Sequence, residues 1–192
     1  GFSLGTSFEK NENLFFSPGV STYFEKISTN SSASASLKKQ EGSYFENKFS
    51  YTLDYDLRNQ KFRTTDGIRS VFSQSVPLIS DDFALMNSYE IKKWHELENS
   101  MVVDINFYGK AINSLTDEDV RVSNRLGLSS SRMRGFETGK IGPRDGNDYV
   151  GGNYAAAINL STTLPMLLES FENIDMKYFI DAGNVWGVDY SD

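Results

Sequence analysis

The chain of 192 residues contains no cysteine, a single histidine and no long apolar run. The lack of cysteine excludes a disulfide scaffold and a thiolate metal site. No segment approaches the roughly 18 consecutive apolar residues that a membrane-spanning helix needs. The net charge of -7 argues against a nucleic-acid partner, which normally requires a basic surface. Because Gly1 falls inside a strand-like pattern without a signal peptide, we expect both ends to be truncations.

Sequence patterns that carry common enzyme chemistry are also lacking. A serine hydrolase needs a Ser/His/acid set, and His95 is the one histidine of the chain. No nucleophile signature surrounds any serine, and no glycine-rich phosphate loop or histidine-carboxylate metal cluster occurs. We therefore expect no catalytic residues, no metal site and no cofactor.

Aromatic residues are plentiful, with 14 Phe, 10 Tyr and 2 Trp, and apolar residues recur with a period of two. In residues 49–57, Phe, Tyr and Leu alternate with Ser, Thr and Asp. This alternation predicts strands with one apolar and one polar face. The aspartates suit a wet lumen better than a buried core. Trp94 and Trp186 fit either an interfacial aromatic belt or ordinary strand positions.

About eight segments share this pattern, and most approach the roughly 10 residues of a tilted membrane strand. Short and long connections alternate between them, and the longest are 27–44 and 113–152. This arrangement predicts an all-β, antiparallel up-and-down transmembrane β-barrel. A soluble β-sandwich has the same periodicity, but its strands are usually shorter. The predicted strands are 1–10, 14–26, 45–58, 67–79, 84–97, 100–112, 153–165 and 176–187.

The connection at 113–152 and the last strand carry four short motifs in a fixed order. A loop of this length in a compact domain is often functional. Each motif alone is weak, whereas the ordered set is specific. They read Arg134-Gly135-Phe136, Gly142-Pro143-Arg144-Asp145, Gly151-Gly152-Asn153 and Phe179-Ile180-Asp181-Ala182-Gly183-Asn184-Val185-Trp186.

This ordered set resembles the outer-membrane assembly-factor family of BamA-like insertases, translocation-assembly proteins and two-partner secretion transporters. The turn at 62–69 is similar to another family motif, with Thr64 where proline is usual. The resemblance implies that residues 1–192 are about eight strands of a 16-stranded barrel, strands 6 to 13 by position. POTRA domains and the terminal barrel strands would be absent. We therefore expect a curved open sheet, with the loop at about 113–152 folded into the lumen.

The resemblance also implies a loop lock. Arg134 is expected to pair with Asp181 on the inner wall, because a guanidinium away from bulk water needs a carboxylate. Gly135 would allow close backbone approach, and Phe136 would pack its ring against the wall. The family often carries a second lumen-facing acid, a glutamate, where this chain has Ser161. The Gly142–Asp145 and Gly151–Asn153 motifs are expected to shape the loop.

By this resemblance the function is assembly and insertion of β-barrel proteins into the bacterial outer membrane, without enzymatic chemistry. The implied partners are unfolded outer-membrane proteins, accessory lipoproteins of the assembly complex and the lipid bilayer. A related translocation or two-partner secretion transporter remains an alternative. A passive diffusion porin is the alternative from another class, but it predicts a charged constriction loop without a motif lock.

Overall fold

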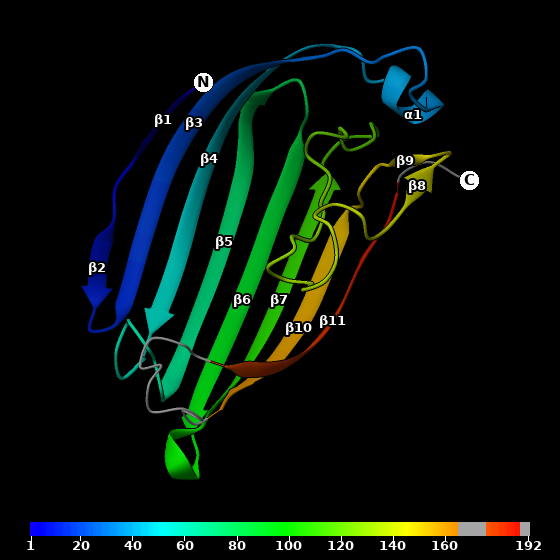
Figure 1. Ribbon diagram of the computed structural model, residues 1–192. Helices are drawn as coiled ribbons and strands as arrows, with labels where there is room; N and C mark the ends of the chain where they lie inside the picture. Colours follow the sequence, from blue (N-terminus) through cyan, green and yellow to red (C-terminus); the bar gives the residue numbers. More distant parts are fainter. Residues whose placement is uncertain (165–175, 189–192) are drawn as a thin grey trace.

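The computed structural model describes residues 1–164 and 176–188, which form one curved antiparallel sheet with a long loop on its concave side (Figure 1). The sheet order is β1-β3-β4-β5-β6-β7-β10-β11, with β2 also paired to β3. Because β1 and β11 end this order, the sheet is open, and the predicted all-β open sheet is confirmed. The strands are β1 (Phe2–Gly5), β2 (Phe8–Asn11), β3 (Leu14–Ile27), β4 (Gly42–Asp56), β5 (Gly67–Ser80), β6 (Ala84–Glu96), β7 (Val102–Ser114), β10 (Tyr154–Thr163) and β11 (Lys177–Trp186).

The first predicted strand, 1–10, is divided into β1 and β2. Both pair with β3, and the break falls at Thr6, opposite Pro18. Proline has no N–H to donate, so the ladder is interrupted there. The Thr6 N–H still donates to the Pro18 carbonyl at 3.1 Å. The interruption therefore has a local chemical cause, and the segment remains one edge of the sheet.

The two faces of the sheet differ as the alternation predicts. On β4, Leu53 and Tyr55 lie on the outer face and are 36% and 42% exposed. On the concave face, Arg69 of β5 donates from Nε and Nη2 to the carboxylate of Asp54, at 3.0 and 2.6 Å. An apolar outer face and a polar inner face are typical of a membrane barrel wall.

The connections contain short elements that the sequence did not predict. The 28–41 connection holds one helical turn, α1 (Ala35–Lys38), and the turn after β6 holds a 3-10 helix, η1 (Glu98–Ser100). The long loop holds a small hairpin of β8 (Arg144–Asp145) and β9 (Asp148–Tyr149). The predicted turn at 166–175 lies outside the described residues. In the part of the chain that the structure describes, no helix is long and apolar enough to cross a membrane.

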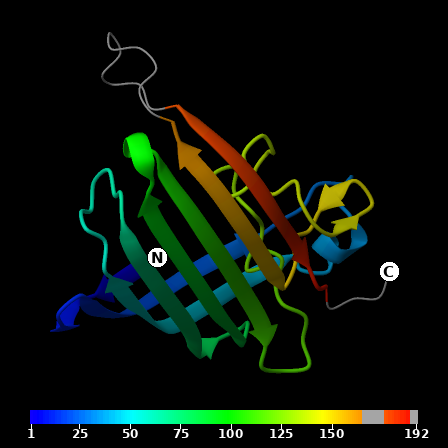
Figure 2. The ribbon, with the colours of Figure 1, turned by 90° about the horizontal axis from the view of Figure 1, so that it is seen from below.

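The apolar core lies between the long loop and the concave face of the sheet, on the side of β7, β10 and β11 (Figure 2). The loop contributes buried Val120, Leu126, Leu128 and Met133. The sheet contributes small side chains under them, with Ala155 and Ala157 of β10 each 1% exposed. Because small residues on β10 leave space above the wall, the loop backbone can pack close to it.

Candidate functional site

The motif arginine of the long loop lies against the inner wall at Asp181. Arg134 donates from Nε and Nη2 to the two carboxylate oxygens, at 2.8 and 2.5 Å, and its backbone N–H donates to Oδ2 at 3.0 Å. Asn159 of β10 donates to Oδ1 at 2.8 Å. The Arg134 guanidinium also stacks on Phe179, 3.7 Å from the ring centroid. Hydrogen bonds to Asp181 raise the pKa of Arg134, which therefore stays charged.

A tight turn presents this arginine to the wall. The N–H groups of Arg132 and Met133 donate to the Ser129 carbonyl, and that of Phe136 donates to the Met133 carbonyl. Gly135 has φ +87°, a conformation that side chains disfavour, while a Cβ added there would meet no atom within 4 Å. Its function is therefore conformational, and the expectation of close backbone approach at Gly135 was wrong.

The expectation for Phe136 was also wrong, because its side chain is 54% exposed. The turn directs Met133 inward instead, and this side chain is 6% exposed. A Cβ added to Gly183 of β11 would lie 2.9 Å from the Met133 sulfur. The close approach of loop and wall therefore occurs between Met133 and Gly183, and Met133 precedes the predicted Gly135 by two residues in the same turn.

A second acidic residue lies near the lock, but on a different strand from the one the family pattern uses. Ser161 of β10 donates through Oγ to Asp104 Oδ2 of β7 at 2.7 Å. Asp104 is 4% exposed and pairs with Lys92 Nζ of β6 at 2.7 Å. Ser161 thus lies beside a buried carboxylate of the neighbouring strand β7.

Arg132 makes another contact between loop and wall, which the sequence analysis missed. Its Nη1 and Nη2 donate to the two carboxylate oxygens of Glu90 on β6, at 2.5 and 2.7 Å. The guanidinium lies 4.0 Å from the ring centroid of Tyr108 on β7. Glu90 is an acidic residue at an inner-face position of β6, between the outer-face residues Tyr89 and Ile91, and this was the available signal.

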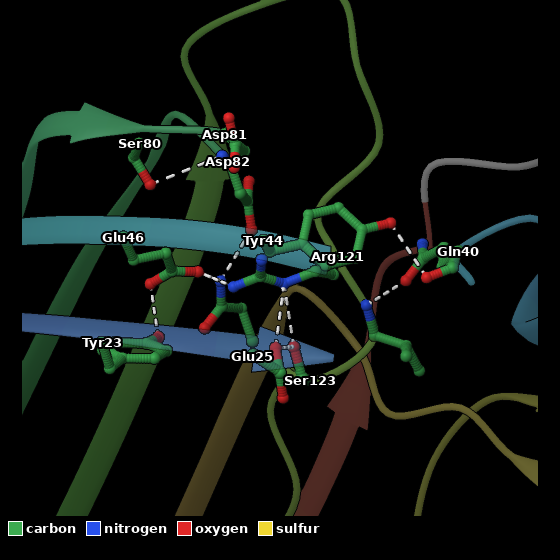
Figure 3. A network of polar contacts seen from close by, with 12 residues as sticks. Tyr23, Glu25, Gln40, Tyr44, Glu46, Ser80, Asp81, Asp82, Arg121 and Ser123 are labelled. Carbon is green, nitrogen blue, oxygen red and sulfur yellow. Dashed lines mark hydrogen bonds and ion pairs between the residues drawn. The ribbon is translucent and has the colours of Figure 1, made fainter. Parts of the chain in front are cut away.

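The start of the loop is anchored by a buried cluster around Arg121, which the sequence did not predict (Figure 3). Arg121 is 3% exposed and forms an ion pair with Glu46 of β4, which is 0% exposed. Its Nε lies 3.4 Å from Glu25 Oε2 of β3 and donates to Ser123 Oγ at 2.9 Å. The ring of Tyr44 lies against the guanidinium, with 4.5 Å to the centroid.

Glu46 has several other partners in this cluster. Lys48 forms an ion pair with it, and the Tyr23 hydroxyl donates to its Oε2. Asn124 of the loop donates to Glu46 at 2.8 Å and to Asp82 at 2.6 Å. Buried charges of both signs are thus neutralised by a distributed set of contacts rather than by one pair.

The glycines of the loop motifs pack directly on the end of β11. A Cβ at Gly142, which has φ +115°, would lie 2.7 Å from Val185 Cβ, and one at Gly152 would lie 2.5 Å from the Trp186 carbonyl oxygen. Gly151 has φ +70°, and a Cβ there would lie 2.8 Å from the Leu126 oxygen. Any larger residue at these positions must displace the loop or the strand.

The remaining residues of these motifs fix the loop to its surroundings. Asn153 is 6% exposed; its N–H donates to the Gly187 carbonyl at 2.7 Å and its carbonyl accepts from Ile112. The Pro143 carbonyl accepts from the N–H of Val150 at 3.2 Å. The Arg144 guanidinium lies 4.0 Å from the centroid of the Tyr149 ring.

The hairpin of the long loop also contacts the 28–41 connection. Asp145 accepts hydrogen bonds from Ser36, from the backbone N–H at 3.0 Å and from the hydroxyl at 2.5 Å. Asp148 accepts from the N–H of Ser34 at 2.9 Å. The hydrogen bonds from Ser36 lower the pKa of Asp145 below its ordinary value. The hairpin therefore holds α1 by charge-assisted contacts.

The single histidine of the chain makes a contact between β6 and the turn before β5. His95 lies in an exposed pair with Asp66, with 3.3 Å between Nδ1 and Oδ1. Across residues 1–164 and 176–188, no group of three or more His, Cys, Asp or Glu side chains could hold a metal ion. What the described site offers chemically is ionic and hydrogen-bonded fixation of a loop.

Comparisons with known proteins agree with this architecture. The chain is 26% identical over 163 residues to a SAM50-like protein of Schizosaccharomyces pombe, covering 80% of this chain and 34% of that protein. Its fold matches the crystal structure of BamA from Haemophilus ducreyi lacking POTRA domains 1–3, with a TM-score of 0.85 at 19% identity. That match covers 96% of this chain and 41% of the BamA chain. The chain thus spans well under half of each of these proteins.

The family model agrees over the whole length of the sequence. The Omp85 superfamily domain matches residues 1–192. Members of this family are outer-membrane proteins, and the relatives above come from a fungus and a bacterium. This chain belongs to the Omp85 superfamily.

Proposed function

We propose that this chain is the middle of the barrel wall, together with the locked loop, of a BamA-like insertase in a bacterial outer membrane. The protein would assemble and insert β-barrel proteins without catalytic chemistry, cofactor or metal. POTRA domains and the terminal barrel strands would lie outside this segment. Its partners would be unfolded outer-membrane proteins, accessory lipoproteins and the bilayer.

The observation that carries this proposal is the bidentate pairing of Arg134 with Asp181. Arg134 belongs to the loop motif and Asp181 to the strand motif of the family, and the fold brings the two together on the concave face. A loop fixed in this way braces the wall from inside. An insertase needs such a brace because backbone groups cannot stay unpaired in lipid, so the strand edge offered to a substrate has to remain positioned.

The test uses the full-length protein reconstituted in lipid vesicles with an unfolded outer-membrane protein as substrate. The measured quantity is the fraction of substrate that becomes folded and protease-resistant. We expect Arg134→Ala to reduce this fraction strongly. Lys140→Ala should leave it near the wild-type level, because this exposed side chain of the same loop lies outside the motifs, over the ring of Tyr149.

The same vesicles distinguish the alternatives. If the substrate folds equally well with and without the protein, while a secreted passenger crosses the membrane only in its presence, the protein is a secretion transporter. If neither occurs and the vesicles leak small solutes, it acts as a porin. Either result would overturn the insertase proposal.

A further inference from the structure

The outer face of the sheet contains a hollow that the loop anchors do not explain. Gly109 of β7 lies between Tyr89 of β6 and Ala156 of β10 in the register, and Ala111 follows on the same face. The small residues Gly109, Ala111 and Ala156 are therefore neighbours on a face otherwise lined by large side chains. They form the floor of an apolar hollow of about 330 Å³.

Aromatic side chains form the rim of this hollow. Phe72, Tyr89 and Phe107 line it along β5, β6 and β7. Tyr154 and Trp186 close the opposite side as a stacked pair, with ring centroids 5.9 Å apart. This rim shapes the hollow as a groove for a narrow apolar group.

The hollow lies at the end of the sheet nearest the long loop. Tyr154 begins β10, Trp186 ends β11, and the Tyr154 hydroxyl donates to Asn113 Oδ1 at 2.7 Å. Tyr and Trp with satisfied polar groups are typical of the boundary between the hydrocarbon core and the headgroups. The hollow therefore lies just inside the hydrocarbon, in the leaflet on the side of the long loop.

A polar residue lines the hollow on the same outer face. Asn87 accepts a hydrogen bond through Oδ1 from Gln74 Nε2 at 2.7 Å, and Gln74 in turn accepts one from the Tyr51 hydroxyl at 3.1 Å. These contacts engage the amides of Asn87 and Gln74 with side chains of neighbouring strands. The surface of the hollow is therefore almost wholly apolar, which fits a hydrocarbon chain.

We propose that the hollow binds one acyl chain of a membrane lipid. The lipid is the occupant because the hollow is part of the apolar wall of an outer-membrane protein, and hydrocarbon surrounds this wall. An empty hollow would lose dispersion contacts on all its lining atoms. A straight chain can fill the space between the aromatic rims. The inference does not depend on which member of the superfamily this is.

The hollow can be filled without disturbing the backbone. A Cβ added to Gly109 would meet only the Phe107 ring, at 3.5 Å, which is an ordinary contact distance. Gly109→Leu should therefore occupy the groove in a folded protein. The matched control is Ala182→Leu, because Ala182 is exposed on the same face, opposite Ile158 and outside the hollow.

The experiment uses the full-length protein in nanodiscs with a phospholipid that carries a diazirine on an acyl chain. After photolysis, adducts are mapped by mass spectrometry, and folding is checked by heat-resistant migration in gels. We expect adducts concentrated on Phe107, Tyr154 and Trp186, reduced roughly tenfold in Gly109→Leu and unchanged in Ala182→Leu. Even labelling along the whole outer face, or undiminished labelling in folded Gly109→Leu, would overturn the proposal.

Discussion

Two parts of the long loop are fixed by different means. In the middle of the loop, the Arg134 guanidinium pairs with the Asp181 carboxylate, and both residues belong to short motifs. Near the start of the loop, the Arg121 guanidinium belongs to a cluster with several buried partners on β3, β4 and the loop itself. When two residues carry most of the stabilisation, they can lie in recognisable motifs and be predicted from the sequence. When a cluster divides the stabilisation among many residues, no single residue of it stands out in the sequence.

This difference predicts that loss of Arg134 and loss of Arg121 lower the stability of the protein by unequal amounts. Arg134→Ala leaves Asp181, whose side chain is 5% exposed, without its bidentate partner. We expect the free energy of unfolding to fall by about 2–3 kcal/mol, as for loss of hydrogen bonds to a charged group. Urea unfolding of the full-length protein in lipid vesicles measures it. Lys140→Ala serves as the control, because this exposed side chain lies outside the loop motifs. An equal loss in both variants would contradict the prediction.

Arg121→Ala should have a smaller effect, although Arg121 is more deeply buried than Arg134. Glu46 keeps Lys48, Tyr23 and Asn124 as partners, so its charge stays compensated. We expect a loss of about 1–2 kcal/mol. Hydrogen exchange should become faster in residues 119–126 while the turn at 129–136 stays protected. Faster exchange in both segments would mean that the two anchors are not independent.

The position of Asp104 leads to a third prediction, which concerns the inner wall at Ser161. Ser161→Glu restores the residue type that the family often has, but it places a second carboxylate beside Asp104. We expect this substitution to cost about 1 kcal/mol through like-charge repulsion. The double variant Ser161→Glu/Asp104→Ser should recover most of the loss in the same unfolding measurement. A stabilising Ser161→Glu would contradict the expected repulsion.

The smallest effect is expected where the hairpin holds α1. The pKa of Asp145 is lowered in the folded protein, so the contact with Ser36 is present above the ordinary aspartate pKa of about 4. It is lost as the pH falls through the lowered value. The protection factor of the Ser36 amide against exchange should fall as the pH drops below the ordinary aspartate pKa in the wild type, and Asp145→Asn should remove this fall. If the protection factor of the Ser36 amide falls at the same pH in Asp145→Asn, other carboxylates cause the fall.

The sequence allowed the sheet to be predicted well because period-two alternation is a local property. Segments such as 67–79 and 84–97 match β5 and β6 within about a residue at each end. The single strand at 1–10 was wrong because Pro18, on another strand, decides where its ladder breaks. Short elements such as α1 and the β8–β9 hairpin depend on tertiary contacts and have little local signal.

The site was partly predictable, because some of its residues lie in short motifs. Arg134 and Asp181 lie in motifs whose order along the chain could be recognised, and the structure places them together. The predicted direction of the Phe136 side chain was wrong, because the conformation of a short turn decides which of its side chains faces the wall. The Arg121 cluster could not be predicted, since its partners lie on β3 and β4, far from the loop in sequence, and carry no motif.

The most direct test of the account is a double-mutant cycle between Arg134 and Asp181 in the full-length protein. Unfolding free energies are measured in lipid vesicles for the wild type, Arg134→Ala, Asp181→Ala and the double variant. If the loop is locked to the wall by this pair, the coupling energy should be about 2 kcal/mol, within the range for residues in direct contact. Additivity within about 0.3 kcal/mol would contradict the account, because two residues that do not interact behave in that way.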